Sequence, residues 1–429
     1  MASTPPDDLD PAPGPDDSQE EVPRGLTPVI GGPFVSLRDR DYRLLWFGTV
    51  FVGFGQWGQQ IGLNWLVFLL TDSAVQLGAV AFAGGILSLF LTPFAGVIAD
   101  RYSRRMIILI ATIAGALQST MLAVLVLTDT VEVWHAYVFA ILTAATQAMN
   151  NPARQAYVND VSSPETLPNA IALASIAQNA SRIVGPPLAG LIAGWNVGAA
   201  FAFVAVIRVG AAILTVMLSA RESARDDSRG NPLRLIFRGF AYLAGEADLR
   251  ALLLVNAITA LFVYPYISFM PVFAERVFDS GASAYGLLVS MIAVGSIFGL
   301  LGLAWLPNLR HRGRWMLIGF VGYDVFLIAF AGAPTLILAM AAVAMAGLFF
   351  GVGSALNQTL FQVLVRNDMR GRGMASLQVA GGLSPIGALS MGFLIEAIGI
   401  RLGVALHISV ALVLIVIVVA FGRSLRRLA

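Results

Sequence analysis

Long apolar blocks constrain this sequence more than any other feature. About twelve of them, most at least 20 residues long, follow one another between residues 43 and 422. A helix of about 20 apolar residues crosses the roughly 30 Å hydrocarbon core of a bilayer. The sequence therefore predicts an all-α polytopic membrane protein with twelve transmembrane helices. The predicted spans are 43–70, 75–99, 106–127, 134–157, 167–193, 198–220, 249–275, 284–306, 315–331, 334–364, 374–397 and 400–422.

The composition excludes several kinds of chemistry. Charged residues make up 12% of the chain, about half of their share in a soluble globular domain. Cysteine is absent, which excludes disulfides and thiolate metal sites. The three histidines lie far apart, at 135, 311 and 407, and no phosphate-binding loop with a lysine occurs. We therefore expect no metal, no cofactor, no enzymatic activity and no nucleic-acid partner.

The first 36 residues are rich in proline and aspartate and have no hydrophobic periodicity. This composition is typical of a disordered tail. The tail also lacks the basic start and the apolar stretch of a secretory signal. The first apolar block is therefore predicted to be an uncleaved transmembrane helix.

Arginine is distributed unequally between the two sets of loops. Because arginine accumulates in cytoplasmic loops, the rich set predicts that both termini are cytoplasmic and that the number of spans is even. The poor set holds only Arg276 and Arg401. The rich set holds Arg38, Arg40, Arg43, Arg101, Arg104, Arg105, Arg221, Arg225, Arg229, Arg234, Arg238, Arg310, Arg312, Arg314, Arg366, Arg370, Arg372, Arg423, Arg426 and Arg427.

A polar stretch divides the spans into two groups of six. Within it, Asn231 and Pro232 have the pattern of a helix start, and apolar residues recur at i, i+3, i+4 and i+7 from Leu233. This pattern predicts an amphipathic helix on the cytoplasmic face. The predicted organisation is a disordered tail over 1–36, a first bundle over 37–220, a linker over 221–248, a second bundle over 249–422 and a cytoplasmic tail over 423–429.

The two groups of spans repeat each other at an offset of about 200 residues. An Asn-Asp pair follows the fourth span at Asp160 and the tenth span at Asp368, and prolines interrupt the fifth and eleventh spans at Pro186 and Pro385. A repeat at this distance indicates a duplicated six-helix unit.

A short motif joins the second and third spans. The segment from Gly96 to Arg105 reads GVIADRYSRR, with Asp100 among three arginines. It resembles the signature of the major facilitator superfamily: glycine, three residues, aspartate, a basic residue, any residue, glycine and two basic residues. Ser103 stands where the family prefers glycine. The resemblance implies two pseudo-symmetric six-helix bundles that move around a central site.

Other stretches look like one branch of that superfamily, the bacterial exporters similar to enterobactin and macrolide efflux proteins. They begin at Asn151 (NPARQA), Leu167 (LPNA), Gly239 (GFAYL) and Arg370 (RGR). The resemblance covers about residues 37 to 401. It implies a monomer in the bacterial inner membrane that exports drugs or siderophore-like molecules by alternating access, with the proton as coupling ion.

The resemblance also implies a cytoplasmic gate. Acidic residues with the arginines around them would hold this gate shut when the cavity opens outward. An anchoring role for the arginines would explain their positions but not Gly96. The gate residues are Gly96, Asp100, Arg101, Arg104, Arg105, Asp160, Asp368, Arg370 and Arg372.

Amide side chains mark the first, fourth, seventh and tenth spans, which line the central cavity in this superfamily. In the first span, Gln56, Gln59, Gln60 and Asn64 lie on one helical face. Uncharged amides with aromatic neighbours suit a neutral or amphipathic solute; hydrogen bonds between helices are the structural alternative. The predicted substrate cavity comprises Gln56, Gln60, Asn64, Gln147, Asn151, Arg182, Asn256, Tyr264, Asn357, Gln358 and Phe361.

Three charged residues lie deep in the spans: Asp324, Arg182 and Arg208. Such residues usually face a bundle interior or a cavity. Asp324 is the candidate proton carrier, with a local capping role as the alternative. Arg154 and Glu396 lie nearer helix ends, where we expect them to extend toward the membrane surface.

Gly185 and Pro186 in the fifth span begin a stretch similar to the Gly-Pro-x-x-Gly-Gly element of drug:proton antiporters. Proline removes a backbone donor and bends a helix, so a kink is predicted, either for transport or for packing alone. Two positions depart from the family pattern. Gln56 stands where these exporters often carry an acid, and residues 140–147 contain no arginine.

Three functions remain open from the sequence. The first is proton-coupled export of amphipathic molecules. The second is import, or flipping of lipids or lysolipids, by the same fold. The third is a membrane scaffold or sensor that transports nothing, which would have no need of an intact motif between the second and third spans.

Overall fold

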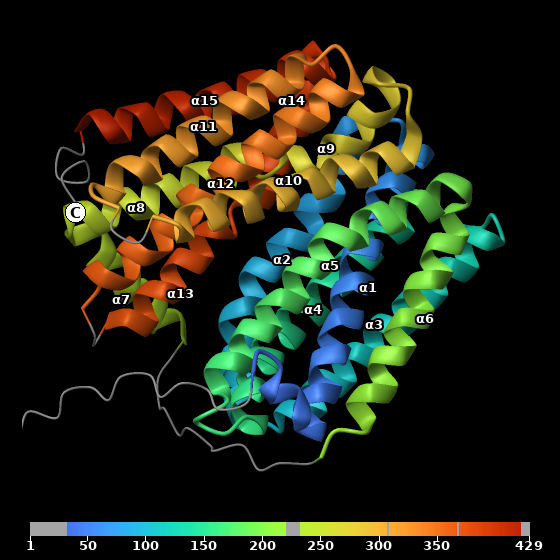
Figure 1. Ribbon diagram of the computed structural model, residues 1–429. Coiled ribbons are helices and arrows are strands. Elements are labelled where there is room, and N and C mark those ends of the chain that lie inside the picture. The colour runs from blue at the N-terminus through green and yellow to red at the C-terminus, as the bar shows by residue number, and fades with distance from the viewer. Residues whose placement is uncertain (1–31, 220–231, 307–308, 367–368, 422–429) are drawn as a thin grey trace, which may run out of the picture.

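The computed structural model consists of helices joined by short loops (Figure 1). Asp368, residues 221–231 of the linker and residues 423–429 lie outside the described residues, as does most of the predicted disordered tail. No strand occurs in the described part of the chain, which comprises residues 32–219, 232–306, 309–366 and 369–421.

Six long helices form the N-terminal bundle. Short polar side chains begin several of them, because a side-chain oxygen can accept a hydrogen bond from the free backbone N–H groups of the first turn. Asp39 accepts from the N–H of Tyr42, and Asn196 accepts from that of Ala199. After the short helix η1 (Val35–Arg38), the bundle contains α1 (Arg40–Thr71), α2 (Ala74–Arg101), α3 (Arg104–Leu127), α4 (Val133–Val161), α5 (Leu167–Trp195) and α6 (Val197–Val216).

Six further spans form the C-terminal bundle, and two of them are interrupted. The seventh span is built from α8 (Ala247–Ile258), the π-helix η2 (Thr259–Val263), α9 (Tyr266–Val272) and the π-helix η3 (Phe273–Val277). The eleventh is divided into α13 (Arg370–Gly381) and α14 (Ser384–Ile398). The continuous spans are α10 (Gly281–Ala304), α11 (Arg312–Gly332), α12 (Leu336–Leu364) and α15 (Ile400–Phe421).

His407 stabilises the break in the seventh span. Pro265 has no N–H group, and Tyr264 donates to the carbonyl of Thr259, five residues back. Nδ1 of His407 lies 2.8 Å from the carbonyl oxygen of Phe262, and Nε2 lies 3.0 Å from the hydroxyl of Ser390. Because a carbonyl only accepts, Nδ1 carries the hydrogen. One buried imidazole therefore joins α15 to α14 and to the seventh span.

Nine helical segments of the described chain are long and apolar enough to cross a membrane. The remaining three spans are α1, α4 and α5, which have 32, 29 and 29 residues. Of these three, α1 and α4 carry more amide and hydroxyl side chains than any other span. The twelve spans in two six-helix bundles agree with the prediction from the sequence.

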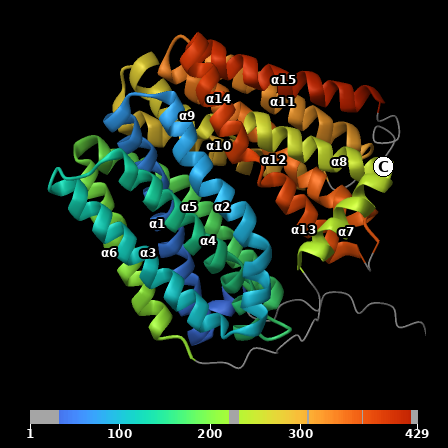
Figure 2. The same cartoon turned by 180° about the vertical axis from the view of Figure 1, so that it is seen from behind.

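The loops define two ends of the molecule. The loops α1–α2, α3–α4, α5–α6, η3–α10, α11–α12 and α14–α15 lie at the arginine-poor end, and the other loops between spans lie at the arginine-rich end. In Figures 1 and 2, the bundles approach each other toward the arginine-poor end and diverge toward the end where α7 (Pro232–Gly245) and α13 lie.

Glycines allow the two bundles to touch backbone to backbone. α5 packs against α10, and α2 packs against α14. A Cβ atom on Gly190 of α5 would lie 2.5 Å from the carbonyl oxygen of Ala282, and one on Gly78 of α2 would lie 2.5 Å from that of Ala388. Without a hydrophobic driving force between helices in lipid, such close approach is a main source of association. Both contacts lie in the arginine-poor halves of their helices.

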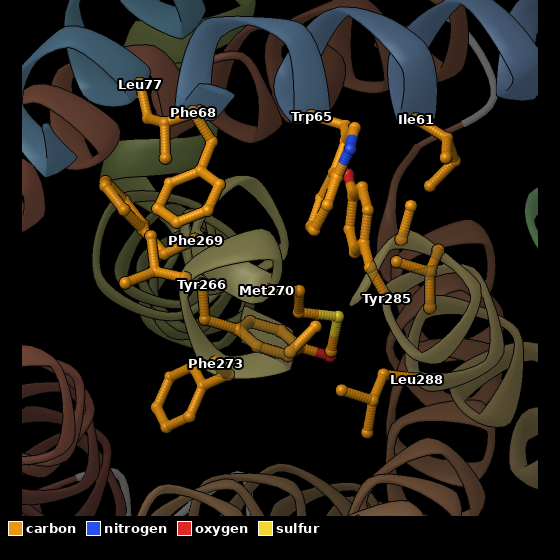
Figure 3. Packing of buried hydrophobic residues seen from close by; sticks show 14 of the residues in the cluster. Ile61, Trp65, Phe68, Leu77, Tyr266, Phe269, Met270, Phe273, Tyr285 and Leu288 are labelled. Carbon is orange, nitrogen blue, oxygen red and sulfur yellow. The ribbon is translucent and has the colours of Figure 1, made fainter. Parts of the chain in front are cut away.

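An apolar cluster fills the space beside these crossings (Figure 3). It contains residues of both bundles, and the rings of Trp65 and Tyr285 stack across the interface with centroids 6.5 Å apart. At the surface of the same end, Arg276 pairs with Asp72 at 2.7 Å. This exposed pair is worth little energy, so the packing of helices holds the arginine-poor end closed.

The amphipathic linker helix packs on the C-terminal bundle. α7 lies against α8 and α13, and its Leu243 is fully buried. The hydroxyl of Tyr242 also accepts a hydrogen bond from the backbone N–H of Arg366. The helix therefore packs mainly on the second bundle, and it also contacts α2 of the first.

The last residues of the predicted disordered tail contact the N-terminal bundle. The hydroxyl of Ser36 donates to the carbonyl of Thr166, and the backbone N–H of Ser36 donates to Asn169. Asn169 in turn donates to the carbonyl of Pro33. Residues 32–36 are thereby held against the start of α5.

We predict that Gly286→Val opens the arginine-poor end. A Cβ on Gly286 would collide with the carbonyl oxygen of Pro186, and overpacking of this kind costs about 1–3 kcal/mol. Because the natural chain has no cysteine, a single Leu77→Cys in the buried interface reports opening. Its reaction with a maleimide in purified protein should accelerate in the Gly286→Val background.

Gly302→Val supplies the matched control, because a Cβ at Gly302 of the same helix meets no atom within 4 Å. It should leave the labelling rate of Leu77→Cys unchanged. Equal labelling in the Gly286→Val and Gly302→Val backgrounds would refute the role of this crossing.

Candidate functional site

Three of the predicted cavity amides are exposed. They are Gln60 on α1, Asn151 on α4 and Gln358 on α12, all well inside their helices. An exposed amide at membrane depth is costly against hydrocarbon, because no lipid tail can pair with it. These side chains are suited to a water-filled space between the bundles.

Two other amides of the predicted cavity form hydrogen bonds between helices. The side chain of Gln56 donates to Gln147 at 2.8 Å and joins α1 to α4. The amide of Asn64 donates to the hydroxyl of Tyr285 at 3.2 Å and joins the two bundles. Both contacts are of the kind expected from interhelical amide bonding, and both residues remain half-exposed.

Arg182 lies beside an aromatic face. Its guanidinium carbon is 5.8 Å from the ring centroid of Trp57, a cation–π distance. Tyr264 packs edge-on against Phe350, and Oδ1 of Asn256 is buried without a hydrogen-bond partner. A cation, aromatic rings and an acceptor are thus present on helices from both bundles.

The sequence places Asn357 and Phe361 on the cavity surface, but the structure buries both side chains. Asn357 is 3% exposed, and its amide nitrogen faces the carbonyl of Leu252 and the sulfur of Met316. Phe361 of α12 is fully buried in an apolar core that also contains residues of α8. Both residues point into the C-terminal bundle in this structure.

Asp324 lies fully buried on α11, and neither of its carboxyl oxygens has a hydrogen-bond partner. The capping alternative is therefore not realised in this conformation. A buried carboxylate without a partner carries a large desolvation cost, so the neutral acid is the form that suits this site.

The fourth span contains a buried arginine instead of a surface-reaching one. Arg154 is 7% exposed, and its Nε donates to Asn150 at 2.7 Å. Asn150 in turn donates to Thr112 on α3. The sequence prediction missed this network because its members come from two helices; only the four-residue spacing of Asn150 and Arg154 hinted at it. Glu396 is exposed, as expected.

Arg208 also points into the N-terminal bundle. It donates to the carbonyl oxygens of Gly115 at 2.9 Å and Gly55 at 3.4 Å. The glycines create the space that the side chain occupies, since a Cβ on either one would lie 2.8–2.9 Å from Arg208 atoms.

One ion pair among the predicted gate residues is described. Nη1 of Arg104 on α3 lies 2.6 Å from the carboxylate of Asp160 on α4. Arg105 donates to the carbonyl of Val216. Both contacts lie within the N-terminal bundle at the arginine-rich end. The side chains of Gly96, Asp100, Arg101, Arg370 and Arg372 are not described.

Gly185 and Pro186 lie inside an uninterrupted helix, α5. Gly185 faces Trp57 of α1, and the Pro186 carbonyl faces Gly286 of α10. The pair therefore lies where α5 contacts α1 of its own bundle and α10 of the other bundle, and the kink stays a prediction.

The transmembrane secretion effector family model matches residues 31–428. The chain belongs to this family. Its relatives include the staphyloferrin A transporter of Staphylococcus aureus, with 27% identity over 82% of this chain and 89% of that protein. The multidrug efflux pump Tap of Mycolicibacterium fortuitum is 26% identical over 90% and 96%. The enterobactin exporter EntS of Salmonella typhimurium is 24% identical over 76% and 78%.

Solved structures show the same fold. A bacterial homologue of the human lysosomal transporter Spinster, in an inward-facing and unoccupied conformation, has a TM-score of 0.72 at 18% identity, covering 91% of this chain and 97% of that one. The nucleoside transporter NupG has a TM-score of 0.71 at 17% identity, covering 89% and 99%. This chain is thus a multi-pass membrane transporter of the major facilitator fold.

We predict that Arg104 and Asp160 are energetically coupled in this protein. Their side chains are only 14% and 12% exposed, so removing one partner leaves a poorly hydrated charge. Asp160→Asn should lower the thermal midpoint of the purified protein. A double-mutant cycle with Arg104→Gln should give a coupling free energy of about 1–2 kcal/mol. Additive losses would contradict direct pairing.

Proposed function

We propose that this protein exports amphipathic small molecules by alternating access, with the proton gradient as its energy source. The observation that carries the proposal is the structural difference between the two ends of the molecule. Interbundle packing lies at the arginine-poor end, while amides are exposed on α1, α4 and α12. A central site reached from one side at a time is what alternating access requires.

The arginine distribution assigns the sides. Arg38, Arg104 and Arg366 are among the arginines of the rich end, and such an excess favours the cytoplasm. We therefore assign both termini to the cytoplasm of a bacterial inner membrane. The conformation described here then faces inward. A monomer suffices for this mechanism, because one chain supplies both bundles.

The lining favours an amphipathic substrate. Gln60, Asn151 and Gln358 offer donors and acceptors without charge, and Trp57 and Tyr264 offer aromatic surface. The relatives include a drug efflux pump and an enterobactin exporter. Export of a drug or siderophore-like molecule is the transport function that this combination supports.

The gate is assigned to the arginine-rich end. Arg104 and Asp160 already lie together there, and the motif that begins at Gly96 and contains Asp100 leads directly into Arg104. In the outward-facing state, these groups and Asp368 with its neighbouring arginines would meet across the bundles and hold the cytoplasmic side closed.

Asp324 is assigned as the proton carrier. It is fully buried in α11 with both oxygens unpartnered, which favours the proton-loaded form in this conformation. The carboxyl group would take up its proton from outside in the outward-facing state and would release it to the cytoplasm when water or substrate reaches it in the inward-facing state. Export would then couple to proton entry through this carboxyl group.

Inside-out vesicles provide the test of export. We expect vesicles that contain the protein to accumulate amphipathic fluorescent drugs when a proton gradient is imposed, and to lose them when an uncoupler is added. Uptake that an uncoupler leaves unchanged would remove the proton from the mechanism. Absence of uptake across drugs, siderophores and lysolipids would remove export itself.

Asp324→Asn separates coupling from binding. The amide resembles the protonated acid in shape but cannot release a proton, so gradient-driven uptake should fall at least about tenfold while substrate exchange at equilibrium persists. Glu396→Gln, an exposed acid of the same bundle, should leave both measurements unchanged. Full gradient-driven uptake by Asp324→Asn would exclude this residue as the carrier.

A further inference from the structure

A small polar pocket lies inside the N-terminal bundle, between α1, α3, α4 and α6. Its volume is about 30 Å³, about enough for two water-sized atoms. Its mouth includes Asn151, which is exposed, and Gln147, which is half-exposed. The polar residues that line it are Gln56, Thr112, Thr146, Gln147, Asn150, Asn151 and Arg208.

Arg208 supplies the charge of this pocket. The side chain is only 7% exposed, so its guanidinium is shielded from bulk water. A guanidinium has five N–H donors, and the hydrogen bonds to Gly115 and Gly55 use two of them. Donors therefore remain for a ligand in the pocket.

A second buried cation lies behind the pocket wall. Arg154 contacts the lining residues Asn150 and Thr112, and its Nη1 is buried without any hydrogen-bond partner. The hydrogen-bond network orients the side-chain oxygen of Asn150 toward Arg154 and leaves the amide hydrogens on the other side, where Thr112 accepts one.

In the part of the chain that the structure describes, no carboxylate pairs with these two charges, those of Arg154 and Arg208. The lining offers amides and hydroxyls, which are neutral. Buried cations inside a membrane protein usually pair with an acid or a ligand, and this pair lacks the acid.

We propose that this pocket binds the anionic group of a ligand, a carboxylate or a small inorganic anion. Its two oxygens would receive N–H donors from Arg208 and amide hydrogens from Gln56, Gln147 or Asn151, a set of partners that matches a carboxylate. The field of Arg154 behind the wall adds to the attraction.

The pocket accommodates one charged group, so the body of a larger ligand would extend past Asn151 into the space between the bundles. In that form the inference rests on the proposed export function and specifies its substrates as carrying an acid. A free anion would instead serve as a permanent partner for the two arginines. In both cases an anion accepts hydrogen bonds from the same donors.

Binding to the purified protein tests the site without any transport. Formate and chloride are added at constant ionic strength, with the bulky sulfonate HEPES as the balancing anion. Formate should raise the thermal midpoint in a saturable way, by about 2–4 °C at full occupancy. A midpoint that formate and chloride leave unchanged would overturn the proposal.

Gln147→Glu is the decisive variant, because a glutamate keeps the acceptor for the hydrogen bond from Gln56 and adds a fixed carboxylate to the pocket. Its midpoint without added anion should rise, and its apparent affinity for formate should fall at least about tenfold through like-charge repulsion. Gln178→Glu, on the exposed surface of α5, should respond to formate as the natural protein does. A response of Gln147→Glu equal to that of Gln178→Glu would overturn the proposal.

Hexanoate and hexanamide distinguish the two possible occupants of the pocket, the acid group of a substrate and a free anion. If the acid of an amphipathic substrate occupies the pocket, hexanoate should act at least about tenfold below the formate concentration, with hexanamide inactive. If the occupant is a free anion, hexanoate, formate and chloride should act at similar concentrations. A stabilisation by hexanamide equal to that by hexanoate would refute recognition of the charge. A failure of drug export together with positive formate binding would reject the proposed function alone.

Discussion

Contact between helix backbones of the two bundles supports the rest of this architecture. Gly78 on α2 and Gly190 on α5 let carbonyl groups of the opposite bundle approach where any side chain would collide. In lipid, apolar side chains gain little by meeting one another, so tight van der Waals contact between small residues becomes decisive. These crossings close one end of the molecule and leave the other end to the polar faces of α1, α4 and α12.

The bundles share an architecture but differ in their interiors. The N-terminal bundle buries two arginines and a chain of amides and hydroxyls between α1, α3, α4 and α6. The C-terminal bundle is joined by apolar packing and by the single imidazole of His407, with Asp324 as its buried acid. Separate charges in separate halves suit a transporter in which one bundle binds an anionic substrate group and the other carries a proton.

Some of the candidate site could be predicted from the sequence. Helical spacing places Gln60 and Asn151 on polar faces, and both are exposed. The same reasoning assigned Asn357 to the cavity, but the structure turns it toward Leu252 and Met316. Periodicity relates residues on one helix to each other. It does not specify which neighbour each face will meet, since that depends on how the helix is rotated in its bundle.

Hydrophobic length indicated that the chain crosses a membrane many times, and nine segments of the described chain are long and apolar enough to do so. Each such span satisfies its backbone hydrogen bonds within its own residues. The motif beginning at Gly96 was likewise readable as a local pattern. Only the tertiary structure decided which end of the molecule is closed and that Arg154 turns inward to Asn150 rather than outward to the surface. These outcomes depend on contacts between helices far apart in the chain, and the energy of such contacts is absent from any single segment.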